Sequence, residues 1–168
     1  MAVSELTAFD YGLSGLLGLS AVIGLWRGLV SELMALFAWG FALFAAWHYN
    51  EAASRLFDGL IAEPIWRLVA GVALVIVSVL LLTAIVRHLV RSLLQAAGLG
   101  ATDRFLGALF GLTRGFIVGL ALVAAGGLAG LSDQAWWVNA KSAPIMERAV
   151  NAAKPWLPRT VAEKIRFR

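Results

Sequence analysis

Four stretches of the chain are almost entirely hydrophobic, and each is about as long as a lipid bilayer requires. They cover residues 6–26, 29–47, 68–86 and 105–131. A hydrocarbon layer about 30 Å thick is crossed by about 20 apolar residues in a helix. The stretch 68–86 has no charged residue and is apolar on every side, whereas a helix of a soluble protein has one apolar stripe and a charged opposite face. The pattern therefore predicts four transmembrane helices.

The first two connections differ in length and character. Only Arg27 and Gly28 stand at the first connection, which leaves room for little more than a turn and predicts a tight antiparallel hairpin. The second connection, residues 48–67, mixes both charge signs. It is predicted to lie at the membrane interface with a short helix near residues 52–60.

The third connection, residues 87–104, is the most basic of the three and ends at Arg104. Gly98 is typical of a residue that ends a helix, because glycine readily adopts the left-handed conformation found there. Thr102 or Asp103 follows and is predicted to cap the start of the fourth helix, where a negative charge suits the helix dipole.

The last 37 residues, 132–168, form a basic tail with three tryptophans of the kind that lie at headgroup level: Trp136, Trp137 and Trp156. Ser142 is predicted to cap a helix with Pro144 in its first turn, and the apolar residues of that helix recur on one face. This amphipathic helix either lies flat on the membrane or packs on the end of the bundle. The predicted class is an all-α membrane protein, with a four-helix transmembrane bundle (residues 1–131) and an amphipathic interfacial tail.

The fourth stretch contains glycines at a strict spacing of four residues: Gly107, Gly111, Gly115 and Gly119. This spacing places them along one face of a helix, and a face without side chains lets another helix approach closely. The pattern predicts a helix-packing interface. The partner is expected to be another helix of the same chain, with a second copy of the chain as the alternative.

Three charged residues lie within the apolar stretches: Asp10, Glu32 and Arg114. An unpaired arginine near the middle of a bilayer is costly, so Arg114 needs a partner, and Glu32 is the first choice. One interpretation is a buried ion pair that fixes how the helices align. The others are a polar path for protons, ions or a small solute, and a binding site for a partner protein.

Composition narrows the function classes. The chain is 61% hydrophobic and only 14% charged, has no cysteine and has two separated histidines, which argues against a metal site, a thiol nucleophile or a bound cofactor. The net charge is +4, and half of the lysines and arginines lie after position 140. Anionic membrane lipids are therefore a simpler partner for this tail than nucleic acid.

Several motifs resemble the colicin V production protein family (CvpA). They are Asp10-Tyr11 in the first stretch, Arg27-Gly28 followed by Glu32, and the run from Gly98 to Gly115 with its Thr102-Asp103-Arg104 element. A tryptophan and a serine after the fourth stretch also fit, matching Trp136 or Trp137 and Ser142. The resemblance implies a four-span protein of the bacterial inner membrane linked to colicin V (toxin) production and envelope homeostasis, with no established catalytic activity.

Two functional hypotheses follow from these observations. The first is a non-enzymatic membrane protein that acts through helix contacts with other envelope proteins or with itself, which the glycine stripe supports. The second is an oligomeric small channel or transporter with a path lined by Asp10, Glu32 and Arg114. An enzyme would need a cluster of reactive side chains at one depth of the membrane, and the sequence predicts none.

Overall fold

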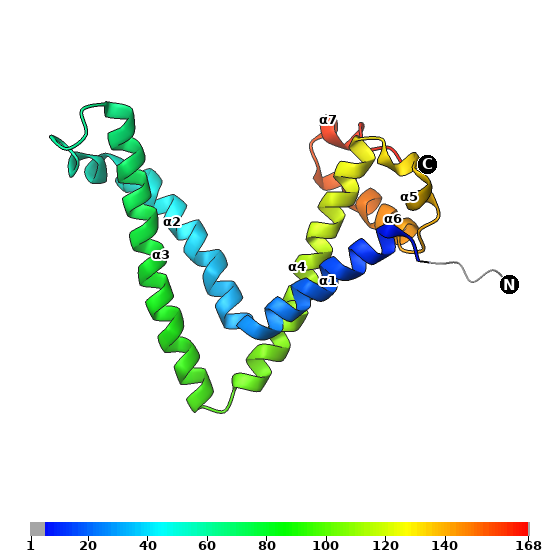
Figure 1. Cartoon of the computed structure of the whole chain (residues 1–168), viewed down its shortest axis with the longest axis horizontal. Coiled ribbons are helices and arrows are strands. Elements are labelled where there is room, and N and C mark those ends of the chain that lie inside the picture. Colours follow the sequence, from blue (N-terminus) through cyan, green and yellow to red (C-terminus); the bar gives the residue numbers. More distant parts are fainter. Residues whose placement is uncertain (1–5, 168) are drawn as a thin grey trace. The chain divides into compact units, whose positions relative to one another are not determined.

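A computed structural model describes residues 6–167, which are mostly helical and contain no strand (Figure 1). Four helices are long and apolar enough to cross a membrane: α1 (Ala8–Arg27), α2 (Leu29–Arg55), α3 (Pro64–Ala96) and α4 (Gly100–Leu128). Shorter helical segments follow them: η1 (Leu131–Asp133), α5 (Ala135–Val138), α6 (Ala143–Ala153), η2 (Lys154–Trp156) and α7 (Arg159–Ala162). The predicted class is confirmed: an all-α membrane protein with four membrane-length helices and a short C-terminal helix.

The chain divides into two compact units. The hairpin unit is Arg27–Gly107, and the terminal unit combines Met1–Trp26 with Ala108–Arg168. This division differs from the predicted boundary at residue 131. The reason is that buried side chains of the tail pack with Phe9 of α1 and Val123 of α4, so the tail belongs to the same unit as those helices.

Small residues let α2 and α3 pack closely as an antiparallel pair in the hairpin unit (Figure 1). A Cβ atom added at Gly71 of α3 would lie only 2.6 Å from the backbone nitrogen of Ser54 in α2. The buried hydrophobic residues of α2 are all alanines: Ala38, Ala42, Ala45, Ala46 and Ala53. Close backbone approach is how helices gain contact energy in lipid, where apolar burial gives no net drive for association.

Two helices of the hairpin unit are longer than the sequence pattern predicts. Residues 52–55 complete α2 and residues 56–60 form turns, so the separate helix expected near 52–60 is wrong. α3 continues ten residues past the apolar stretch, because the arginines there favour helix and need only leave the hydrocarbon. Its 33 residues span about 50 Å at roughly 1.5 Å each.

The turn between α3 and α4 has the predicted glycine stop but not the predicted cap. α3 ends at Ala96, Ala97 is its C-cap residue, and Gly98 follows with φ 76°, in the left-handed region that favours glycine. α4 begins at Gly100, so Thr102 and Asp103 lie inside its first turn rather than before it. The prediction that one of them caps α4 is therefore wrong, and the Asp103 carboxylate bonds to a different helix.

The terminal unit is built on an antiparallel pair of helices, α1 and α4. Three glycines of α4 lie against α1: Gly111 next to Ser20, Gly115 next to Ser20 and Leu17, and Gly119 next to Leu13. The Ser20 hydroxyl donates a hydrogen bond of 2.7 Å to the Gly111 carbonyl oxygen. Backbone contact and one buried hydrogen bond thus join these helices of a single chain.

Replacing Gly111 with alanine is expected to destabilise the terminal unit. The added Cβ would collide with the Ser20 carbonyl group, and backbone cannot move aside as a side chain can. Overpacking of this kind costs about 2 kcal/mol. The measurement is the thermal unfolding transition in detergent, monitored by size-exclusion chromatography with fluorescence detection. Gly15→Ala is the matched control, because nothing lies within 4 Å of a Cβ at that helical position, and an unchanged Gly111→Ala transition would contradict the packing described here.

The tail folds into a small hydrophobic core with the ends of α1 and α4. Met146 and Val150, on one face of α6, are 2% and 1% exposed and join the same buried cluster as Phe9. The predicted amphipathic helix is thus present, and its apolar face packs on the chain itself. Trp137 is 3% exposed and packs inside the terminal unit, whereas Trp156 is 90% exposed. The expected position of these tryptophans at headgroup level stays a prediction.

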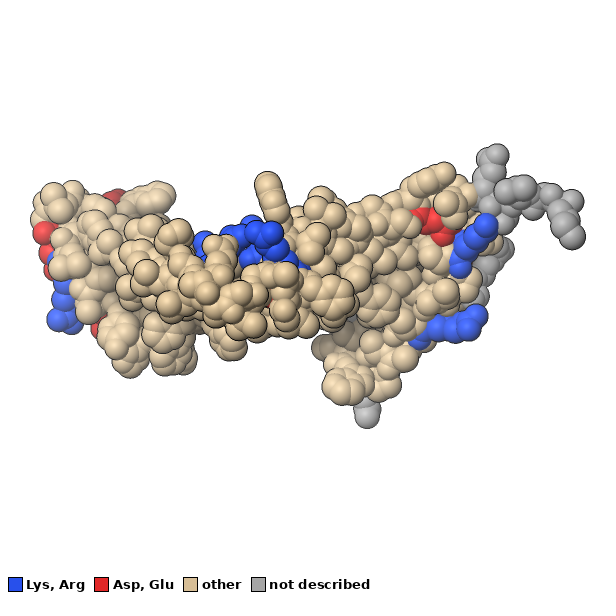
Figure 2. Space-filling model, turned by 90° about the horizontal axis from the view of Figure 1, so that it is seen from below, with Lys and Arg blue, Asp and Glu red and all other residues tan. Residues whose placement is uncertain are grey.

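Long parts of the outer surface carry no charge. Figure 2 shows lysine and arginine gathered in a few groups on one face, with uncharged surface between them. The hairpin unit contributes many exposed large apolar side chains, among them Phe37, Phe41, Phe44, Leu81 and Leu82. Such a surface is expected where helices face lipid.

Candidate functional site

Asp103 joins the start of α4 to the start of α2 inside the hairpin unit. Its Oδ1 accepts a 2.9 Å hydrogen bond from the backbone N–H of Val30, in the first turn of α2. A carboxylate at a helix N-terminus satisfies an N–H group that has no partner within the helix and suits the positive end of the helix dipole. Asp103 therefore caps α2 from a position 73 residues away.

Gly28 is the residue that makes room for this carboxylate. It precedes α2 with φ 81° and ψ 157°, a region of backbone conformation that is essentially restricted to glycine. A Cβ at this position would overlap Asp103 Oδ2. The Arg27-Gly28 and Thr102-Asp103-Arg104 elements, far apart in the sequence, thus depend on one contact between Gly28 and Asp103.

Basic side chains surround this contact. Arg27, Arg91 and Arg104 line a small pocket together with Asp103. Glu32, in the first turn of α2, is 4% exposed, and its Oε1 lies 3.5 Å from Nη1 of Arg27. The expected pairing of Glu32 with Arg114 would join the two units and stays a prediction.

Asp10 holds two helix starts together in the terminal unit. Its carboxylate accepts hydrogen bonds from the N–H and hydroxyl of Thr7, which precedes α1. It also accepts from the N–H groups of Lys141 and Ser142 and, at 2.5 Å, from the Ser142 hydroxyl, just before α6. The first set contains one half of a capping box, in which the carboxylate accepts from the N–H of the residue before the helix, and the second brings a negative charge to another helix N-terminus.

Arg114 contacts the serine that joins α1 to α4. Its Nε lies 3.3 Å from Ser20 Oγ, which accepts from the guanidinium while its own proton goes to the Gly111 carbonyl. The predicted charged residue and two of the predicted glycines, Gly111 and Gly115, therefore meet at Ser20. The sequence reasoning missed Ser20, because a serine in an apolar helix has no distinguishing pattern and α1 contains two of them.

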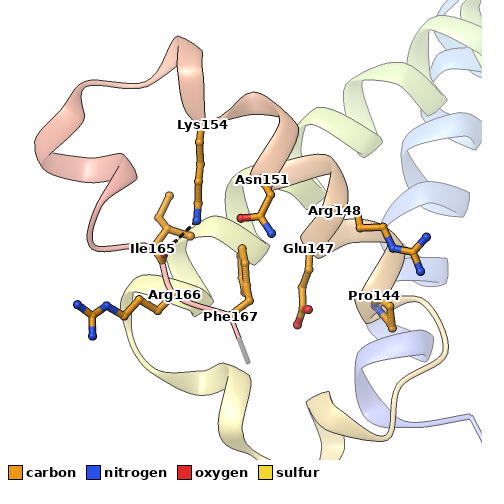
Figure 3. Close-up of a pocket in the computed structure, with 8 residues that line it drawn as sticks. All are labelled: Pro144, Glu147, Arg148, Asn151, Lys154, Ile165, Arg166 and Phe167. Atoms are coloured by element: carbon orange, nitrogen blue, oxygen red, sulfur yellow. Dashed lines mark hydrogen bonds between the residues drawn. The ribbon is translucent and has the colours of Figure 1, made fainter.

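A groove of about 490 Å³ lies on the tail, between α6 and the C-terminal residues (Figure 3). Two of the charged side chains that line it, Glu147 and Lys154, hold parts of the tail together. Glu147 Oε1 accepts a 2.7 Å hydrogen bond from the indole of Trp137, and the Lys154 ammonium donates to the Ile165 carbonyl at 3.0 Å. Lys154 also lies over the Phe167 ring, 5.7 Å from its centre.

The structure gathers the predicted site residues into separate places. Asp103 meets Gly28 in the hairpin unit, with Arg27 and Arg104 nearby, and Asp10 and Arg114 have different partners in the terminal unit. Within residues 6–167, no three His, Asp or Glu side chains are grouped so that they could hold a metal ion.

The fold and these contacts define a multi-span α-helical membrane protein whose carboxylates hold the starts of its helices. The sequence model of the family described as colicin V production protein matches residues 9–151. The chain belongs to this family.

Two relatives support the assignment. The colicin V production protein of Escherichia coli (strain K12) is 34% identical over 114 residues, which cover 68% of this chain and 70% of that protein. The colicin V production protein homolog of Haemophilus influenzae is 35% identical over 115 residues, covering 68% of this chain and 69% of the relative. No solved structure matches the chain.

Proposed function

We propose that this chain is a non-enzymatic protein of the bacterial inner membrane that acts in colicin V production and in envelope homeostasis through helix contacts. The names of the two relatives support the link to colicin V production. The proposal that the chain is not an enzyme rests on the structural role of Asp103, which lies in the motif that resembles the family. Its carboxylate is engaged by the backbone of Val30 at the start of α2, which is the position of a structural group.

The surface of the hairpin unit supports action through contacts within the membrane. α3 has the highest mean hydropathy of the four membrane-length helices, yet only 6% of its apolar segment is buried within the chain. A long apolar helix of this kind is open to lipid and to the helices of other envelope proteins. Association by such a face depends on shape and close packing.

A polar path is the second candidate, and the contacts of Asp10 weigh against its part in one. All five hydrogen bonds of the Asp10 carboxylate come from Thr7, Lys141 and Ser142, which stand at helix starts. A carboxylate held by so many donors is suited to fixing structure. Action through helix contacts and a polar path differ in what they predict for a substitution at Glu32.

Complementation tests the proposal. A bacterial strain that lacks its own colicin V production protein, but carries the toxin genes, is supplied with this chain, and released toxin is measured on a lawn of sensitive cells. We expect the wild-type chain to restore release and Asp103→Ala to lower it. Membranes separated by density should contain the chain in the inner-membrane fraction.

Glu32→Gln distinguishes the candidates in the same assay. A protein that acts through helix contacts should keep toxin release when this variant folds, because the amide retains the shape of the side chain. Loss of release by a variant with wild-type yield and a wild-type unfolding transition would favour the polar path. Failure of the wild-type chain to restore release would contradict the role in toxin production.

A further inference from the structure

A second pocket of the hairpin unit, of about 380 Å³, lies between the first turns of α2 and the second half of α3. Its lining residues are Arg27, Ser31, Ala84, Arg87, His88 and Arg91. We refer to it as the arginine pocket. Arg87 and Arg91 are four residues apart on α3, so they project from the same face of that helix.

The arginine pocket is strongly basic. Three of its six lining residues are arginines, a fourth is histidine, and none carries a carboxylate. Two acids lie near these arginines: Glu32 of α2, which is 3.5 Å from Arg27, and Asp103 of α4, which caps α2 and lies with Arg27 and Arg91 in the smaller pocket described above. Guanidinium groups bind phosphate oxygens through paired N–H groups, and such charge-assisted hydrogen bonds are strong.

The position of the pocket along α3 indicates the depth at which an anion would be bound. The charge-free run from residue 68 to residue 86 spans about 28 Å, close to the thickness of the hydrocarbon layer. Ala84 lies at the end of this run, and Arg87 and Arg91 lie on the next turns. A pocket with one apolar residue and three arginines therefore opens where the phosphates of lipid headgroups lie.

We infer that the arginine pocket binds a phosphate group, supplied by the headgroup of an acidic phospholipid or by soluble phosphate. Arg87 and Arg91 would bind its oxygens, and Ser31 offers a hydroxyl donor from α2. The inference goes beyond the proposed function, because it assigns a ligand to the arginine pocket, whereas the proposed function concerns helix contacts between proteins. It also does not depend on a role in toxin production.

Retention of lipid by the purified full-length protein tests the site. The protein is extracted from vesicles of phosphatidylcholine and phosphatidylglycerol, and the bound phosphatidylglycerol is counted by native mass spectrometry. We expect the double variant Arg87→Gln and Arg91→Gln to bind phosphatidylglycerol more weakly than the wild type, by about fivefold for each arginine removed. Arg55→Gln with Arg148→Gln removes two exposed arginines elsewhere and should leave retention unchanged.

A second titration distinguishes the two sources of phosphate. Inorganic phosphate is added to the protein in nanodiscs of phosphatidylcholine alone, and the unfolding temperature is followed. Stabilisation of the wild type, absent from the Arg87 and Arg91 variant, would identify soluble phosphate as a ligand of the pocket. Arginine-dependent retention of phosphatidylglycerol without this stabilisation would identify the lipid headgroup.

The inference is overturned if neither ligand distinguishes the wild type from the pocket variant, or if the control pair loses as much lipid. Size-exclusion profiles establish that each variant is folded. If the double variant does not fold, Arg87→Gln alone is compared with Arg55→Gln, with the same expectation of about fivefold weaker binding. Equal binding by those two single variants would also overturn it.

Discussion

Gly28→Ala is expected to be the most damaging single substitution in the hairpin unit. An alanine must adopt the glycine backbone conformation at φ 81° and ψ 157°, which costs about 1–3 kcal/mol. Its Cβ would also overlap the Asp103 carboxylate, so the cap of α2 must be lost or displaced. We expect a total loss of about 3–5 kcal/mol. Yield and the unfolding transition in detergent measure this effect.

Two controls separate the contributions to the Gly28 effect. Gly59→Ala places alanine at φ 87°, where nothing lies within 4 Å of the new Cβ, and reports the cost of a positive φ without a collision. Asp103→Ala removes the cap without the collision. The Gly28 variant should be less stable than either control, and equal stability of Gly28→Ala and Gly59→Ala would refute the close contact with Asp103.

Asp10→Ala is expected to have the largest effect in the terminal unit. The Asp10 side chain is 4% exposed, and its removal leaves the N–H groups of Thr7, Lys141 and Ser142 without their acceptor. Leaving a buried donor unsatisfied costs about 1–3 kcal/mol, and because these hydrogen bonds are partly buried and such terms are not additive we expect a total of about 3 kcal/mol.

The same unfolding measurement in detergent checks the Asp10 variant. Asp10→Asn keeps one acceptor oxygen and should retain part of the stability. Asp133→Ala removes an exposed acid of the same unit and should change stability by less than about 0.5 kcal/mol. An Asp10→Ala protein as stable as the Asp133 variant would show that the carboxylate does not hold the tail to α1.

Features that depend on neighbouring residues could be predicted from the sequence. The four apolar stretches lie within α1 to α4 to within a few residues, because membrane-length hydrophobic runs leave few alternatives. The glycine stop at Gly98 is also local, since it reflects the backbone freedom of one residue. The extension of α3 was missed because the arginines after the apolar run mark the end of the hydrocarbon and not the end of the helix.

Features that depend on distant residues could not be predicted. Asp103 has the position and chemistry of a cap for α4, and only the folded chain brings the start of α2 to it. The donors of Ser142 lie 132 positions from Asp10. Trp136 and Trp137 form a pair typical of a membrane interface, but their side chains have different surroundings. Trp136 is exposed, whereas Trp137 is buried in the core and its indole donates a hydrogen bond to Glu147.

The bond between Asp10 and Ser142 also imposes an order on biosynthesis. The segment that becomes α1 leaves the ribosome first, whereas its partners on α4 and before α6 are translated about a hundred residues later. The α2–α3 hairpin is local in sequence and can close in the meantime. The first helix to be inserted is therefore among the last to be completed, and nascent chains released before residue 142 would present an α1 whose buried Asp10 lacks its donors from the tail to the quality-control proteases of the membrane.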